Sequence, residues 1–97
     1  MYIIRNTMYA KPGHGGALID KLKAARPHFE AMGMGNPRIL SDAVTTTWMI
    51  AMEFEVESVS TYFDMLEGRT KSEGLRTAME GYADHVSSGK REILKVA

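Results

Sequence analysis

The sequence predicts an α+β fold in which helices cover one face of a four-stranded antiparallel sheet. Three observations support this fold class: a central strand of alternating character, an order of segments that begins and ends with a strand, and apolar residues on both strand faces. The stretch Thr45–Val56 shows the alternation best. Successive side chains of a strand point to opposite faces, so its large apolar row predicts a buried face: Trp48, Ile50, Met52, Phe54 and Val56.

Composition limits the classes of protein that the chain can belong to. Its 97 residues predict a single domain, residues 1–97, and 44% hydrophobic with 25% charged residues is typical of globular proteins. Twelve basic and twelve acidic residues give a net charge of zero, which argues against a nucleic-acid partner. The chain has no cysteine, which excludes disulfides and thiolate metal sites. The opening MYIIRNTMY is too short for a signal peptide or membrane span, so we expect a cytoplasmic protein with no membrane partner.

The first half of the chain reads as a strand, a helix and a short strand. Alternation predicts a strand over Tyr2–Ala10, with Asn6 the one polar member of a row that also holds Ile4 and Met8. A helix is expected from Ala17 to about Met32, because Leu18, Leu22, Ala25 and Phe29 recur at helical spacing. Pro27 predicts a kink or a break near Arg26. The segment Gly33–Pro37 is expected to be a loop, and Arg38–Asp42 a short strand.

The second half reads as the central strand, one or two helices and a closing strand. Ser58 is a candidate N-cap for a helix that ends at Gly68. A second helix is expected from about Ser72 onward, with the apolar stripe Leu75, Met79, Tyr82 and Val86. The segment Ser87–Gly89 is expected to turn the chain into a closing strand, Arg91–Val96.

This order of elements is the ferredoxin-like βαββαβ plan, in which the helices cover one face of the sheet. The opposite face still carries Ile3, Tyr9, Met49 and Ala51. A large apolar face left open to water is unusual, and a second copy of the sheet across a two-fold axis would cover it. The sequence therefore predicts a homodimer in which Ile3 and Met49 are buried between two sheets.

Three short segments and the overall length of the chain also resemble those of a known group of proteins. The turn Lys11-Pro12-Gly13, the run Phe54-Glu55-Val56-Glu57-Ser58 and the ending Ser88-Gly89-Lys90-Arg91-Glu92-Ile93, taken with the element order, resemble the dimeric α/β-barrel superfamily. That superfamily includes antibiotic-biosynthesis monooxygenases and haem-degrading monooxygenases. The resemblance covers the whole chain and implies a homodimer with a ligand pocket between helices and sheet in each protomer. It concerns architecture, and fold does not imply function.

The haem-degrading branch of the superfamily uses an Asn on the first strand, a Trp on the helix after the third strand and a His late in the last helix. Asn6 matches the first of these by element, and His85 matches the last. The Trp is missing, because that helix carries Tyr62 and Phe63 while Trp48 belongs to the expected third strand. The structural alternatives are that Asn6 forms a hydrogen bond to a neighbouring backbone group and that His85, beside Asp84 near a helix C-terminus, interacts favourably with the helix dipole.

The cofactor-independent monooxygenase branch binds flat aromatic substrates in pockets that use Asn, Trp, Tyr and His. Asn6 and His85 are the candidate catalytic residues that this branch implies, with His85 as a proton acceptor. Trp48, Met52, Tyr62 and Tyr82 are the candidate pocket residues, although an aromatic residue at such spacing is more often part of a core. No cofactor is expected for this chemistry.

Metal, hydrolytic and RNA-binding functions are less consistent with the sequence. His14, His28 and His85 are dispersed and show no metal-binding spacing, so no metal site is expected. Asp84 beside His85 does not make a catalytic triad by adjacency alone. An RNA-recognition domain shares the βαββαβ order, but the chain lacks its basic glycine-aromatic run. The sequence therefore predicts a dimeric protein that binds a hydrophobic or aromatic small molecule, either as a cofactor-independent monooxygenase or as a non-catalytic binding module.

Overall fold

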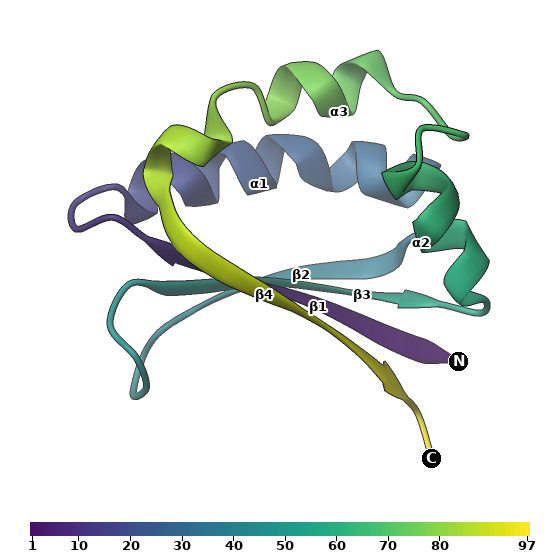
Figure 1. The fold of residues 1–97 in the computed structure, drawn as a ribbon, viewed down its shortest axis with the longest axis horizontal. Coiled ribbons are helices and arrows are strands. Elements are labelled where there is room, and N and C mark those ends of the chain that lie inside the picture. Colours follow the sequence, from purple (N-terminus) through teal and green to yellow (C-terminus); the bar gives the residue numbers. More distant parts are fainter.

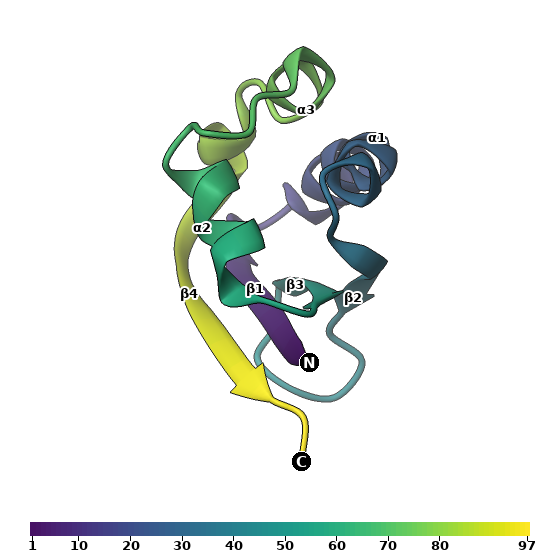
Figure 2. The same ribbon diagram turned by 90° about the vertical axis from the view of Figure 1, so that its right-hand side faces the viewer.

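A computed structural model describes residues 1–97 and shows one antiparallel sheet with all helices on the same side of it (Figures 1 and 2). The strand order is β2-β3-β1-β4, so the first and third strands are the central neighbours of the sheet. This confirms the α+β, ferredoxin-like prediction. The elements are β1 (Tyr2–Ala10), α1 (Gly15–Ala31), β2 (Gly35–Ser41), β3 (Met49–Val56), α2 (Val59–Leu66), α3 (Glu73–Ala78), the short 3-10 helix η1 (Tyr82–His85) and β4 (Val86–Lys95).

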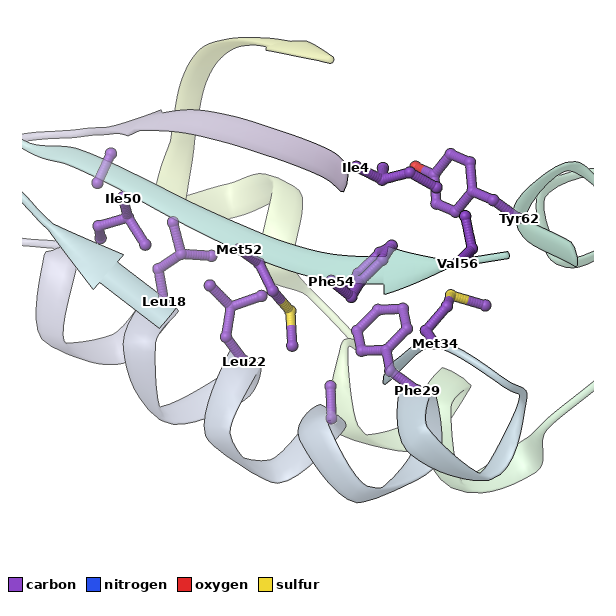
Figure 3. Packing of buried hydrophobic residues seen from close by; sticks show 12 residues of the cluster. Ile4, Leu18, Leu22, Phe29, Met34, Ile50, Met52, Phe54, Val56 and Tyr62 are labelled. Carbon is purple, nitrogen blue, oxygen red and sulfur yellow. The ribbon is translucent and has the colours of Figure 1, made fainter. Parts of the chain in front are cut away.

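The hydrophobic core lies between the sheet and α1 (Figure 3). The expected rows of β1 and β3 supply its sheet side through Ile4, Ile50, Met52, Phe54 and Val56, and the predicted stripe of α1 faces them. Three aromatic rings pack together at one end of the core, where the Phe54 ring centroid lies 5.2 Å from that of Phe29 and 5.7 Å from that of Tyr62. Burial of each such side chain contributes about 1.5–3 kcal/mol, so this row anchors the sheet against α1.

The first helix runs through Pro27 without a break, so of the predicted kink or break near Arg26 the break is wrong. Proline removes the hydrogen bond that the carbonyl of Lys23 would accept. Both Lys23 and Pro27 lie on the exposed side of α1, where water can solvate that carbonyl. Ala25 and Phe29 are buried on the other side and hold the helix on both flanks of the proline.

Strand boundaries in the β2–β3 hairpin differ from the sequence-based prediction. Strand β2 begins at Gly35 and includes Pro37, so the loop expected over Gly33–Pro37 is wrong for its last three residues. It is an edge strand with an irregular register near that point, and an edge strand tolerates a residue without an N–H group. Strand β3 begins only at Met49, because Trp48 has a positive φ of 66° that no extended strand adopts.

The region after β3 contains more breaks than expected. Ser58 caps α2, as predicted, by accepting a hydrogen bond from the backbone N–H of Ser60. The expected long last helix stops at Ala78, and Gly81 with φ of 76° turns the chain into η1. Strand β4 then starts at Val86, so the predicted turn at Ser87–Gly89 is wrong. Those residues are instead extended, because they pair with β1 along its length.

None of the helices is long and apolar enough to cross a membrane.

Candidate functional site

A cleft of about 430 Å³ opens on the helix-facing side of β1 and β4. One wall is the sheet, the second is α1, and the third is the segment that joins α3 to β4. Most of the wall is apolar, and a few polar groups stand at one end. The lining residues are Asn6, Thr7, Met8, Leu22, Phe29, Met52, Met79, Tyr82, Val86, Gly89, Lys90 and Arg91.

The polar end of the cleft is a hydrogen-bonded cluster around Asn6. The amide Nδ2 of Asn6 donates to the hydroxyl oxygen of Tyr62 at 3.1 Å, and the Tyr62 hydroxyl lies 3.3 Å from Asn6 Oδ1. Arg91 Nε donates to the same Oδ1 at 3.0 Å. Asn6 is therefore held by two side chains and by no backbone group. Such fixation keeps its amide in one orientation at the cleft wall.

Strand register and helix position bring the three members of this cluster together. Arg91 of β4 pairs directly with Asn6 of β1, so both side chains emerge on the same face of the sheet. Tyr62 comes from α2 and is 1% exposed, packed among core aromatic rings. The guanidinium carbon of Arg91 lies 5.3 Å from the centroid of the Tyr62 ring, a cation–π contact. Tyr62 thus supports Asn6 and Arg91 from behind.

A second cleft of about 410 Å³ continues from the first past the C-terminal half of α1. The two clefts share Phe29, Met79 and Tyr82 as common lining residues. Met32 and Met65 line the second cleft, and Met8 and Met52 line the first. Methionine side chains are flexible and polarizable, so the apolar side of the two clefts is adaptable. The rest of the second cleft is polar, with Thr70, Lys71, Ser72, Glu73 and Arg76 among its lining residues.

An exposed carboxyl at the rim of the second cleft, Glu73, has a shifted pKa. Glu73 and Arg76, at the rim of the second cleft, form an ion pair of 2.8 Å. The hydrogen bond from Arg76, aided by its charge, lowers the pKa of the Glu73 carboxyl below the usual 4.5. Both side chains are solvent-exposed, so the pair is a surface feature rather than a reacting group.

The structure separates the candidate residues that the sequence suggested. It brings Asn6, Met52 and Tyr82 onto the wall of one cleft and places Tyr62 directly behind Asn6. Trp48 lies outside the cleft and precedes β3, which starts at Met49 rather than at Thr45. The side chain is 38% exposed and lies beside Gly15 at the start of α1. Trp48 is therefore neither a buried core residue nor part of the wall of this cleft, in contrast to both sequence-based expectations.

His85 also lies outside the cleft, in η1 rather than in a long last helix. The backbone N–H of Lys11 donates to the carbonyl of His85, at the far end of β1 from the Asn6 cluster. Val86 pairs with Ala10, four residues along β1 from Asn6, which corresponds to about 13 Å at strand spacing. His85 is therefore not a direct neighbour of Asn6, although Val86 beside it lines the cleft.

Sequence reasoning missed two contacts that only the folded chain creates. His14 and His85 meet with their Nδ1 atoms 2.9 Å apart, so one ring donates and the other accepts. No third metal-ligating residue joins them, as no group of three or more such residues occurs. Arg91 was treated as part of the closing strand only. Its position opposite Asn6 could have been read from the register of the two strands, had the start of β4 been known.

Comparisons with known proteins extend the description of the fold. No family profile and no curated protein sequence matches this chain. Among solved structures, protein Atu4242 from Agrobacterium tumefaciens aligns with a TM-score of 0.80 at 12% identity, over 100% of this chain and 94% of that one. A "putative antibiotic biosynthesis monooxygenase" from Chloroflexus aurantiacus J-10-fl aligns at 0.76 and 16% identity, over 99% and 93%. An uncharacterized NIPSNAP domain protein from Burkholderia xenovorans aligns at 0.79 and 9% identity, over 100% and 95%.

These similarities bear out the resemblance at the level of the fold. The chain has the ferredoxin-like fold of proteins that are named as antibiotic-biosynthesis monooxygenases and NIPSNAP proteins. At such low sequence identity they establish the shape of the chain and no shared chemistry. The haem-degrading pattern is not supported by the geometry, because Trp48 and His85 both lie outside the cleft that holds Asn6.

Proposed function

We propose that the cleft beside Asn6 binds a flat hydrophobic or aromatic small molecule. The observation that carries the proposal is the form of the cleft: about 430 Å³, walled by apolar side chains, with a fixed amide and a guanidinium at one end. Small-molecule sites have this volume and this combination of apolar walls with few convergent polar groups. Asn6 is half-buried there, and one of its amide N–H groups has no partner within the chain.

A second candidate function is cofactor-independent oxygenation of a phenol bound in the same cleft. The Asn6–Tyr62–Arg91 cluster favours it, because an amide donor and a cation would stabilise the negative charge of a phenolate. A phenol with a free para position and O₂ would give a para-quinone and water, which balances the atoms and electrons. His85 does not line the cleft, and this favours the alternative, a binding module without catalysis.

Ligand binding by the wild type and by Asn6→Ala tests the first proposal. Isothermal titration with a panel of flat phenols and with haem is expected to show saturable binding of a phenol and weaker binding by the variant. The chain's other asparagine provides the control as Asn36→Gly, since Asn36 has a positive φ that glycine tolerates. Oxygen consumption with bound phenols separates oxygenase from binding module. No binding of any compound by the wild type would overturn the proposal.

We propose further that residues 1–97 form one domain of a homodimer whose sheets pack face to face. The outer face of the sheet carries Ile3, Met49 and Leu94 beside a nearly buried carboxylate, Glu53, which Arg38 pairs at 2.7 Å. Arg5 also pairs with Glu53 and lies 4.0 Å from Glu92, so the charged groups of this mixed face are paired within the sheet beside its apolar side chains. Such a face suits a self-complementary contact.

Sedimentation at micromolar concentration is expected to show a dimer for the wild type and a monomer for Met49→Lys on the outer face. Leu66→Lys is the control, because Leu66 is an exposed apolar residue of α2 on the helix side. A monomeric wild type would contradict the dimer proposal.

A further inference from the structure

The charged groups that line the first cleft are cationic, and no carboxylate is among its lining residues. The two basic residues that line it, Lys90 and Arg91, lie on opposite faces of β4. Lys90 pairs in register with Thr7, which faces away from the helices, and its ammonium lies 4.0 Å from the Glu92 carboxylate. Arg91 pairs with Asn6 and faces the cleft. The cleft therefore presents one guanidinium at its mouth and no acid to neutralise it.

The guanidinium of Arg91 is held in place by two side chains, but only one of its three nitrogens forms a hydrogen bond within the chain. Its Nε is occupied by Asn6 Oδ1, and its plane is supported by the Tyr62 ring. The two terminal nitrogens have no hydrogen-bond partner within the chain, and Arg91 forms no ion pair. Terminal guanidinium nitrogens form a planar fork that matches the two oxygens of a carboxylate. A positioned, unpaired fork is thus the main polar feature offered to a ligand.

The rest of the cleft is apolar and extends away from this fork. Leu22 and Phe29 of α1 face Met52 of β3, and Met79 leads into the second cleft. A ligand that fills the first cleft therefore has an apolar body and one polar end. A single guanidinium balances one negative charge, which suits a monoanion better than a phosphate dianion.

We propose that the ligand is an apolar carboxylic acid, whose carboxylate binds the terminal nitrogens of Arg91 while its flat body lies between the sheet and α1. The proposal rests on the function proposed above and adds the chemical class of the ligand. It assigns Arg91 as a specificity-determining residue. Asn6 and Tyr62 act as positioning residues, because they fix the direction of the guanidinium.

Matched probes separate charge from shape. Isothermal titration compares 2-naphthoate, an anion, with 2-naphthamide, a neutral molecule of almost the same shape. The wild type is expected to bind 2-naphthoate about tenfold more tightly, the low end for a charge-assisted hydrogen bond because Arg91 is solvent-exposed. Arg91→Gln is expected to lose this preference and to keep its affinity for 2-naphthamide. Arg69→Gln, a control at an exposed arginine that pairs with Asp64, should bind as the wild type does.

The outcomes distinguish this proposal from the one on which it rests. Equal affinity of the wild type for the two probes, with no change in Arg91→Gln, would overturn the carboxylate proposal and leave the small-molecule site intact. Binding of neither probe would overturn both. If Arg91→Gln does not fold, the comparison of the two probes on the wild type, repeated at high salt, still decides the question. A preference for the anion that weakens with salt supports the proposal.

Discussion

The hydrogen bond between Asn6 and Tyr62 can be measured by a double-mutant cycle. Tyr62→Phe removes only the hydroxyl and keeps the ring that packs on Phe54. Asn6→Ala removes the amide but leaves the Tyr62 hydroxyl in a site where the residue is 1% exposed. An unsatisfied buried group of this kind costs about 1–3 kcal/mol, and a made hydrogen bond contributes about 1 kcal/mol. We therefore expect the double variant to lose about 1 kcal/mol less than the sum of the single variants.

Urea unfolding at one fixed protein concentration gives the free energies of unfolding for this cycle. The control cycle combines Asn6→Ala with Tyr82→Phe, because Tyr82 lines the same cleft but is exposed and makes no hydrogen bond to Asn6. The changes in unfolding free energy caused by substitutions at independent sites add to within about 0.3–0.5 kcal/mol, and we expect this additivity for the control cycle. If the Tyr62 cycle is equally additive, the cluster does not hold Asn6 in place, and the reasoning about a fixed amide fails.

Two further predictions concern exposed positions on the helices. Pro27→Ala should raise the free energy of unfolding by about 1–2 kcal/mol, because it restores the hydrogen bond to Lys23 in a helix that is already continuous, while the unfolded chain gains some freedom. A loss of stability in urea would contradict this account of α1. NMR titration should find the pKa of Glu73 below 4.5, and Arg76→Gln should return it toward that value. Because the folded-state pKa is lowered, the pair stabilises the fold above the unfolded-state pKa and ceases to do so as the pH falls through the folded-state value.

Periodicity predicted the parts of the fold that burial alone decides. The alternation of Ile50, Met52 and Phe54 and the helical spacing of Leu18 and Leu22 identified the two surfaces of the core correctly. The burial of these residues does not depend on the exact residue at which their strand or helix begins or ends. The order of elements was therefore readable from apolar spacing, and the adjacency of the first and third strands followed from that order.

The errors occur where tertiary contacts override local preferences. Pro27 remains helical because packing on both sides of it outweighs one lost hydrogen bond. Trp48 continues the apolar alternation of β3, yet its positive φ ends the strand before it. Helix α3 stops at Ala78, Gly81 turns the chain into η1, and β4 then starts earlier than expected, at Val86. Each boundary depends on contacts with distant segments that the local pattern does not contain.

The candidate site was accessible from the sequence only in part. Asn6 stood out as a polar residue in an apolar row, and the structure places it at a cleft. Arg91 did not stand out, since its importance comes from its register opposite Asn6. The pairing of His85 with His14 was equally invisible, because 71 residues separate the two along the chain. Contacts of this kind are set by the fold and not by local composition.

Methyl NMR of the methionines tests most directly whether the cleft is a small-molecule site. The chain has eight methionines, of which Met8, Met52 and Met79 line the first cleft while Met49 lies on the opposite face of the sheet. On titration with 2-naphthoate or 2-naphthol, the methyl signals of the three cleft residues should move together along one saturable curve, and that of Met49 should stay in place. Movement of Met49 alone, or no movement at any concentration, would contradict the account.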